Sequence, residues 1–405
     1  MHALNPADRA KSIENTLRRR AARSATGAEG IVGTEGAANA ATTPVHADDV
    51  LERLDAVIKR LPPSEVGDPA KFKQEWQTLL EHGEPALKKL LQPVANSNPE
   101  FSPDDLASME AVVIADGTRP SFLLREGSYA PDHPFLGDWK DELTDFRPSL
   151  RRLAGCVGRL QLPNGGPAKY NGTGFLVDAN DCLVLTNYHV VVHARQVSGV
   201  AMSSTGTGLD VNSAWVIDFN GEVDSEKKNR WLVKEVRLPA GFGVSFDGVD
   251  AAVLRIEPFD PQESRLPQPA IVLSGDPNYA SGARAPTLGT IGFPGYPDKT
   301  LPAGATVNWN FVITTLFNNL FGLKRFAPGE FCDGTGSVEG DQLGHVLSYD
   351  ATTFGGASGS PVFGWKDEGS PAFALHFAGL NTEANYGVSL HKAKAALCAV
   401  GAPIS

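Results

Sequence analysis

Apolar residues follow a helical spacing in the part of the chain that begins near Asp48. The residues that share one face lie three or four positions apart: Leu51, Leu54, Ile58 and Leu61. Asp48 suits the N-cap of such a helix, and Pro62 and Pro63 cannot continue it. We therefore expect a helix that starts near Asp48 and ends before the two prolines.

Two further helical stretches are expected before residue 92. Their apolar residues are Phe72, Trp76, Leu79 and Leu80 in the first, and Leu87, Leu90 and Leu91 in the second. Gly83 and Pro85 separate the two stretches, and both residues weaken a helix. Residues 111–114 and 121–124 are apolar runs on either side of the turn-like Asp116-Gly117, which predicts a short hairpin.

The residues from 48 to 140 are therefore predicted to form a small α-rich accessory domain. Before it, residues 1–47 are predicted to form a flexible arm, because residues 24–47 are rich in Ala, Gly and Thr.

The pattern changes after Pro148. Short runs of apolar residues alternate with Gly, Pro, Asn and Asp, and the clearest runs are residues 172–177, 182–185, 251–254, 290–293 and 360–363. Many short strands separated by turn signals predict an all-β barrel or sandwich. Residues 391–400 are helical in composition and would close a domain that extends over residues 148–405.

Length and composition are those of an ordinary soluble protein. The 405 residues are 41% hydrophobic and 20% charged, with a net charge of −11, which argues against nucleic acid as the main partner. The basic run at residues 18–20 is expected to be solvated, with a docking patch as the alternative. The first 30 residues contain no apolar stretch of signal-peptide length, and nothing later approaches a membrane span. These features predict a cytoplasmic protein without a membrane partner.

Four cysteines in so long a chain do not indicate a disulfide framework, and no two of them have C-x-x-C spacing. His189 and His193 are four positions apart, but the H-E-x-x-H pattern of a zinc protease is absent. We therefore expect no metal and no cofactor.

The most specific string runs from Gly355 to Phe363 and reads Gly-Gly-Ala-Ser-Gly-Ser-Pro-Val-Phe. A serine between glycines suits a tight turn whose backbone N–H groups can approach a substrate. We therefore predict that Ser358 is a nucleophile and that the amides of Gly356 and Ser358 form an oxyanion hole. The alternative is an ordinary glycine-rich loop between strands.

A serine nucleophile needs a base, and the base needs a carboxylate that fixes its tautomer. His189 directly follows the run 182–185, so its side chain would be held at a strand end, although a core histidine is the alternative. Asp250 opens the apolar run 251–254, so its carboxylate is expected to enter the core, with a strand-leading cap as the alternative. Asp247, before a glycine, is more typical of a turn.

Five strings together resemble the trypsin/chymotrypsin family of serine proteases and occur in that family's order, His then Asp then Ser. They are Gly172-Thr-Gly-Phe-Leu-Val, Leu185-Thr-Asn-Tyr-His189-Val-Val, Asp250-Ala-Ala-Val-Leu-Arg-Ile, Gly356-Ala-Ser358-Gly-Ser-Pro-Val-Phe and Asn385-Tyr-Gly-Val. The sequence is most similar to the bacterial branch that includes the glutamyl endopeptidases, where the nucleophile string also ends Ser-Gly-Ser-Pro-Val-Phe. The resemblance covers residues 148–400. It implies two six-stranded antiparallel barrels with a triad at their interface, and a serine endopeptidase that cleaves protein or peptide substrates through an acyl-enzyme.

The resemblance also implies a primary specificity pocket. Thr352 stands where an Asp would select Arg or Lys, so cleavage after basic residues is not expected. Thr353 and His376 match the residues with which the glutamyl branch binds a carboxylate, and Gly379 lies on the same strand as His376. Phe354 is bulky for such a pocket, so acidic and apolar side chains stay open as alternatives.

Three features depart from that family. Residues 310–345 are expected to be an inserted surface excursion with a packed apolar face, a membrane-touching loop being the alternative. Ile31-Val32-Gly33-Thr34 resembles an activated protease N-terminus but lacks a preceding basic residue, so we treat it as a coincidence. Residues 1–140 are expected to restrain the protease or tether it to an activating protein partner, a packing appendage being the alternative.

Two other functions are alternatives to proteolysis. A catalytically silent binding module with the same fold would be expected to have lost a triad residue, and none is lost. A lipase would need Gly in place of Ser360, and its acid and base would both follow the serine.

Overall fold

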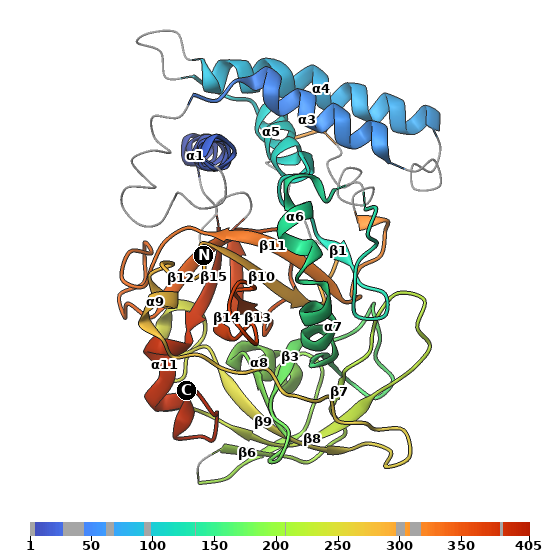
Figure 1. Ribbon diagram of the computed structural model, residues 1–405, viewed down its shortest axis with the longest axis vertical. Coiled ribbons are helices and arrows are strands. Elements are labelled where there is room, and N and C mark those ends of the chain that lie inside the picture. Colours follow the sequence, from blue (N-terminus) through green and yellow to red (C-terminus); the bar gives the residue numbers. More distant parts are fainter. Residues whose placement is uncertain are drawn as a thin grey trace.

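Two β-barrels and a group of helices are stacked in the computed structural model (Figure 1). The structure describes residues 5–26, 44–61, 69–92, 99–133, 135–206, 208–296, 304–307, 317–380 and 384–405. The N-terminal helices lie at one end, the second barrel is in the middle, and the first barrel is at the other end. Among the described residues, no helix has an apolar stretch long enough to cross a lipid bilayer.

The first barrel is a closed ring of six antiparallel strands. They are β2 (Val157–Gln161), β3 (Gly172–Asp178), β4 (Leu183–Thr186), β7 (Val216–Asp218), β8 (Arg230–Arg237) and β9 (Ala252–Pro258). The pairing of β8 with β9 closes the ring, and β5 (Met202–Ser204) and β6 (Gly208–Val211) extend it beyond β8. α8 (Tyr188–Gln196) follows β4 directly, and the turn η3 (Ser245–Asp247) precedes β9.

The second barrel is built in the same way. Its strands are β10 (Thr287–Gly292), β11 (Arg325–Phe331), β12 (Val346–Ala351), β13 (Pro361–Phe363), β14 (Ala372–Leu380) and β15 (Ala384–Ser389). The pairing of β11 with β12 closes this ring, and the short β1 (Phe122–Leu123) pairs with β11 on the outside. α9 (Pro277–Ala280) precedes β10, and α11 (Leu390–Cys398) follows β15, as the composition of residues 391–400 predicted.

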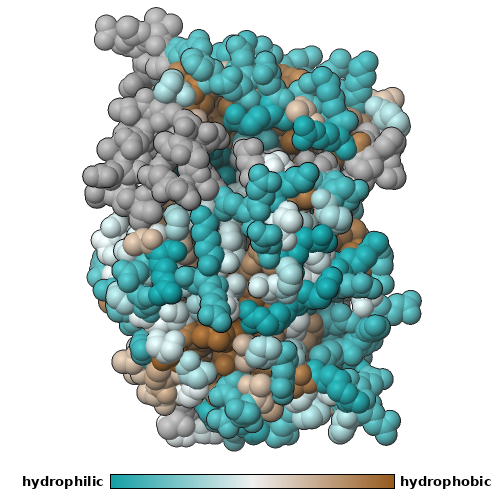
Figure 2. Space-filling model, in the orientation of Figure 1, coloured by the Kyte–Doolittle hydropathy of each residue, from teal (hydrophilic) through white to brown (hydrophobic). Residues whose placement is uncertain are grey.

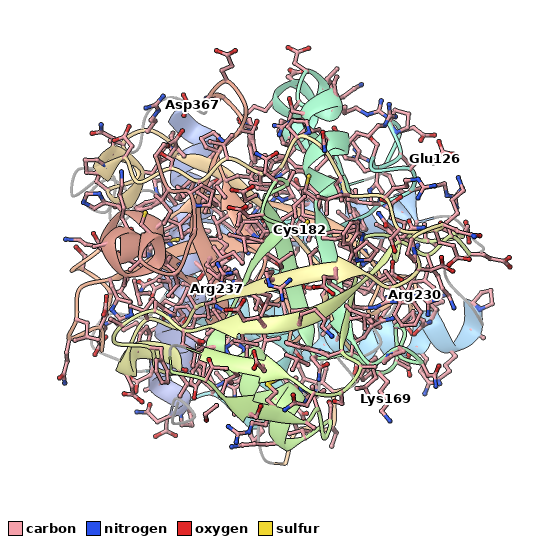
Figure 3. All side chains as sticks on the ribbon, turned by 90° about the horizontal axis from the view of Figure 1, so that it is seen from below. Glu126, Lys169, Cys182, Arg230, Arg237 and Asp367 are labelled. Atoms are coloured by element: carbon pink, nitrogen blue, oxygen red, sulfur yellow. The ribbon has the colours of Figure 1, made fainter. Side chains whose placement is uncertain are left out.

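The prediction of two six-stranded antiparallel barrels is therefore confirmed, as is an α-rich N-terminal region. Each of the five apolar runs singled out in the sequence overlaps a barrel strand. Their side chains enter the core: Phe175, Leu185, Val253 and Ile291, for example, are completely buried. Charged residues such as Glu126 and Lys169 lie at the rim of the molecule (Figure 3). None of the four cysteines is paired in a disulfide.

The helical region consists of α1 (Pro6–Thr26), α3 (Ala47–Arg60), α4 (Pro69–Leu91) and α5 (Pro103–Ala115). α3 confirms the helix expected from Asp48, although its N-cap is His46. α5 lies at the centre of the group and is buried along almost its whole length. Three short helices, η2 (Gly137–Trp139), α6 (Lys140–Thr144) and α7 (Arg147–Gly155), lead from this region into β2.

The flexible arm predicted for residues 1–47 is wrong for residues 6–26, which form α1. Ile13 and Leu17 are buried in the helical core, so packing orders this segment. Residues 27–43, including Ile31-Val32-Gly33-Thr34, lie outside the described residues.

Two other local predictions are also wrong. The expected break at Gly83 and Pro85 is absent, because α4 continues through both residues where Gly83 packs against α5. The expected hairpin is absent too. Residues 111–114 belong to α5, where burial on all sides favours a helix whose backbone is satisfied internally, and the strand β1 pairs with β11 instead.

The predicted insertion over residues 310–345 needs the same correction. Its segment 325–331 is β11, a barrel strand whose Phe326 is completely buried. The apolar face expected before it is present at Phe317, which is buried against the helical core. Residues 308–316 lie outside the described residues.

Candidate active site

His189 and Asp250 stand at the same end of two paired strands. His189 is the second residue of α8, directly after β4, and Asp250 precedes β9, which pairs with β4 through Thr186 and Ala252. His189 Nδ1 lies 2.8 Å from Asp250 Oδ2, and the His189 backbone N–H donates to Oδ1 at 3.0 Å. Because the carboxylate accepts from Nδ1, this nitrogen carries the proton and Nε2 has a free lone pair.

The Asp250 carboxylate is completely buried and has a third donor, the Ser245 N–H at 3.1 Å. Its neighbour Asp247 is exposed in η3. Of the two aspartates considered from the sequence, Asp250 is the one that the structure brings to His189.

Two residues that the sequence did not single out hold the Asp250 segment. The buried amide of Asn187 donates to the Asp250 carbonyl at 2.7 Å. His345 Nε2 lies 2.8 Å from the Gly248 carbonyl, and its other ring nitrogen lies 3.2 Å from Asp341. The Asn187–Asp250 contact joins residues 63 positions apart, and the His345–Gly248 contact joins residues 97 positions apart. No local pattern could have predicted either of them.

Ser358 lies in the turn between β12 and β13, and this turn is docked on the first barrel. The Thr173 N–H of β3 donates to the Ser358 carbonyl at 2.8 Å. Gly359 has a φ of +91°, and a Cβ there would lie 1.9 Å from the Thr173 carbonyl oxygen. Only glycine fits this position, for conformational and for steric reasons.

The turn that contains Ser358 meets α8 at Gly172. A Cβ on Gly172 would lie 2.7 Å from a Val190 methyl and 3.1 Å from the Ser358 carbonyl oxygen. The structure thus brings Ser358 and the His189 segment together where the two barrels join. The Ser358 hydroxyl donates to the Phe377 carbonyl at 3.3 Å, and in the described part of the chain it has no hydrogen bond to His189.

The two residues predicted to form the oxyanion hole have backbone N–H groups that are available as donors. Ala357 N–H donates to the Phe354 carbonyl, and Gly356 has a φ of +95°, as at the third residue of a type II turn. Among the described residues, the N–H groups of Gly356 and Ser358 have no acceptor. A Cβ on Gly356 would lie 2.2 Å from the Tyr170 hydroxyl. The positive φ and this lack of space both require glycine at position 356.

Two of the predicted pocket residues, Thr353 and Gly379, lie together. The Thr353 hydroxyl donates to Asn385 Oδ1, and this oxygen occupies the space in front of Gly379, 2.6 Å from where a Cβ would be. His376 is buried on the same strand as Gly379. Asn385 stands in the sequence only as part of a motif, but its amide oxygen lies between Thr353 and Gly379.

His376 is in its neutral form. Burial, with a further effect from nearby His189, lowers its pKa to about 3. Its Nδ1 lies 2.6 Å from the Tyr349 hydroxyl, and burial raises the pKa of Tyr349, which keeps that hydroxyl protonated. If Tyr349 donates to Nδ1, Nε2 carries the remaining proton and is a hydrogen-bond donor.

Thr352 is turned away from these residues. Its hydroxyl donates to the Arg119 carbonyl at 2.5 Å, and it lines a small cavity together with Gly117 and Phe317. The sequence alone could not indicate this partner, because it belongs to the helical region.

Aromatic side chains surround the site. Tyr188, next to His189, is in edge contact with Phe242, which is 46% exposed. Phe246 is in edge contact with Phe377 and Tyr386. On the face shown in Figure 2, hydrophobic residues gather near the level where the two barrels meet. An exposed apolar surface beside these polar groups suits the binding of an extended chain.

The predicted absence of a metal site concerned His189 and His193. His193 Nδ1 is bonded to the Asn171 side chain at 3.0 Å, and His189 to Asp250. In the described part of the chain, no cluster of three or more His, Cys, Asp or Glu residues could hold a metal ion.

Known proteins are similar to this chain in sequence. Residues 172–370 match a trypsin-like peptidase domain. A probable serine protease of Lysobacter enzymogenes is 42% identical over 363 residues, which cover 89% of this chain and 91% of that protein. This aligned length exceeds that of residues 148–405, so the likeness extends into the helical region.

Solved structures show more distant likenesses. The Rv3671c protease from M. tuberculosis, in its active form, is 17% identical, with a TM-score of 0.36 over 63% of this chain and 85% of that one. The Vibrio cholerae VesB protease is 13% identical, with a TM-score of 0.38 over 60% of this chain and 62% of that one.

Proposed function

The chain belongs to the trypsin-like serine protease family, and from that premise we propose that it is a serine endopeptidase with His189, Asp250 and Ser358 as its triad. The observation that carries this proposal is the 2.8 Å pairing of His189 with the fully buried Asp250. A buried carboxylate that fixes the imidazole tautomer prepares Nε2 to act as a base. A catalytically silent binding module, the alternative, would have no use for this pair.

In the proposed reaction, Ser358 Oγ attacks the carbonyl carbon of the scissile peptide bond while His189 Nε2 accepts the hydroxyl proton. The N–H groups of Gly356 and Ser358 hold the oxyanion that forms. The C–N bond then breaks, the amine leaves with the proton from His189, and an acyl-enzyme ester remains on Ser358. A water molecule that gives its proton to His189 hydrolyses the ester, and Ser358 recovers its proton.

A fluorophosphonate probe on the purified full-length protein tests this proposal. We expect the probe to label Ser358, and Ser358→Ala to lose both labelling and peptide hydrolysis, the latter by several powers of ten. The variant should unfold at the same temperature as the wild type, because among the described residues the hydroxyl bonds only to the Phe377 carbonyl. A folded wild-type protein that neither reacts with the probe nor cleaves casein would favour the silent binding module.

For the primary pocket, we propose that Thr353, His376 and Gly379, narrowed by Asn385, recognise a side chain that accepts hydrogen bonds. Thr352 supports the pocket from outside through its bond to Arg119. Because His376 is neutral, it offers a hydrogen-bond donor without a fixed positive charge. The proposed pocket then resembles that of the glutamyl branch in its shape and its polar residues, but it does not have the positive charge of a protonated histidine.

A peptide library measures this preference directly. We expect cleavage after Glu and Gln at comparable rates near pH 8, because a neutral imidazole donates to either side chain. His376→Ala should remove the preference for both. Cleavage only after large apolar residues would overturn the pocket assignment and leave the nucleophile assignment intact.

We further propose that residues 1–140 regulate the protease and are the place where an activating protein partner would act. Phe354, four residues before Ser358, packs against Phe317 and the helical core, which supports a connection between the two regions. A truncation test should keep β1, because Phe122 is buried among the aromatic residues of the second barrel. A protein that starts at Pro44 and retains wild-type rate and substrates would indicate that residues 1–43 are a packing appendage.

A further inference from the structure

A group of buried charges joins α1 to the second barrel. In Figure 1, α1 lies between the α3–α4 pair and the second barrel, beside α5. The charged residues are Arg20 of α1, Asp116 and Arg119 in the segment after α5, Glu330 of β11 and Asp350 of β12. Arg20, Asp116, Arg119 and Asp350 are each less than a tenth exposed.

Arg20 is the member of this group that α1 contributes. Its Nη1 donates to the Val113 carbonyl at 2.6 Å and to Asp116 at 3.2 Å, and its Nε lies 3.4 Å from Asp350 Oδ2. One guanidinium thus bonds α5, the residue that ends it and a barrel strand at the same time. The planar, many-donor shape of arginine suits this role, and lysine could not fill it.

Asp350 depends on these partners because it is buried. Burial alone would raise the pKa of its carboxyl group, but the charges of Arg119 and Arg20 hold that pKa well below its ordinary value. Arg119 Nε lies 3.2 Å from Asp350 Oδ2, and Arg119 Nη2 lies 2.8 Å from Glu330. A buried carboxylate that loses one of its cationic partners is strongly destabilised in its position.

The segment that follows Asp350 leads directly to the nucleophile. The Thr352 hydroxyl is bonded to the Arg119 carbonyl, Thr353 lies in the primary pocket, and the Phe354 ring lies 5.1 Å from the Phe317 ring. The turn from Phe354 to Ala357 directly precedes the turn from Ala357 to Ser360, which contains Ser358. The helical region therefore touches this segment at residues 350, 352 and 354, every second position.

Resting on the proposed function, we propose that Arg20 is a positioning residue: through Asp350, α1 holds residues 350–354 in the geometry that forms the primary pocket. α1 is then an activating element in cis, and its removal or displacement lowers activity. If α1 instead inhibited the protease by blocking the site, the loss of Arg20 would raise activity. A partner that binds α1 would control the enzyme by stabilising or displacing this contact.

The test is Arg20→Gln in the full-length protein, with Arg9→Gln as the matched control. Arg9 also lies on α1 and also binds a buried carboxylate, with its Nε 2.8 Å from Glu110 of α5, but within the described residues it has no hydrogen bond or ion pair with the barrel. We expect Arg20→Gln to lose about 10- to 100-fold in kcat/KM on a peptide that fills the primary pocket, because a displacement near 1 Å can cost that much. The loss should lie mainly in KM, and Arg9→Gln should keep the wild-type values.

Chemical rescue adds a readout that a general loss of stability would not give. Ethylguanidine at millimolar concentration should restore part of the kcat/KM of Arg20→Gln and leave Arg9→Gln unchanged. A folded Arg20→Gln with wild-type or higher kcat/KM, or an equal loss in Arg9→Gln, would overturn the inference. If Arg20→Gln does not fold, a wild-type KM in folded Arg20→Lys would overturn it equally.

The same experiment separates this inference from the proposed function. Wild-type protein that fluorophosphonate does not label at Ser358 contradicts the proposed protease activity itself. Wild-type protein that is labelled, together with Arg20 variants that are equally fast and have an equal KM, contradicts only the role of α1.

Discussion

At the scale of single residues, Asp250 organises both sides of the histidine. One carboxylate oxygen accepts from the His189 N–H, and the other accepts from His189 Nδ1 and from the Ser245 N–H. One buried carboxylate thus holds the His189 ring, the His189 backbone and the loop before β9. This arrangement favours Asp250 over Asp247 as the proposed triad acid, since Asp247 is exposed.

The two aspartates can be compared by matched substitutions. Asp250→Asn should lower kcat by roughly 10⁴-fold, because an amide cannot accept from Nδ1–H in the same way and the imidazole loses its correct tautomer. Asp247→Asn should change kcat by less than about twofold, since its side chain makes no contact with His189 in the structure. Both variants are assayed on one fluorogenic peptide, and the opposite order of effects would transfer the acid to Asp247.

The sequence could identify the candidate triad because each residue stands at the edge of an apolar run or within a glycine turn. It could not identify Asn187, Asn385 or Arg20, whose roles arise from partners in other elements. It also gave no indication that Thr352 faces the helical region. Short-range patterns report backbone conformation, whereas these contacts depend on tertiary packing.

At the scale of elements, the barrel strands could be predicted and three of the four N-terminal helices could not be predicted fully. α1 has apolar residues with helical spacing at Ala10, Ile13 and Leu17. The prediction of a flexible arm rested on the composition of residues 24–47 and was extended over this segment. α5 is buried on all sides, so it has no amphipathic pattern to read. Its capping box, Ser102 with Asp105, was the available signal for its start.

α4 shows how packing can override a helix-weakening residue. A Cβ on Gly83 would meet Ser108 and Val112 at 3.5 Å, which is ordinary van der Waals contact. We therefore expect Gly83→Ala to raise the free energy of unfolding by up to about 1 kcal/mol, since alanine favours a helix over glycine. Gly83→Leu should lower it by about 1–3 kcal/mol by overpacking the contact with α5. Urea unfolding of the three proteins at one pH measures both, and a destabilised Gly83→Ala would mean that the contact is closer than described.

At the scale of the whole molecule, the helical region and the second barrel share buried groups. β1 adds Phe122 to an aromatic cluster with Tyr129 and Phe326. Trp139 and Phe146, from the segments that lead into the first barrel, pack against Trp365 of the second barrel. These contacts suggest that the helices and the second barrel unfold together, whereas the sequence predicted an accessory domain that ends near residue 140.

Two histidines, the buried His376 and the half-buried His133, should make this shared structure sensitive to acid. Burial lowers the pKa of His133 to about 4 and that of His376 to about 3, whereas an unfolded histidine titrates near 6.5. Between these values the unfolded chain binds more protons than the folded one, so stability falls as pH falls below about 6.5 and the loss is complete only near the folded pKa values. Each histidine contributes on the order of 1 kcal/mol per pH unit in this window. The free energy of unfolding in urea should therefore be several kcal/mol lower at pH 5 than at pH 7.5. His133→Gln should flatten part of this dependence because it removes one of the two titrating rings, and an unchanged slope would show that His133 is protonated in the folded protein.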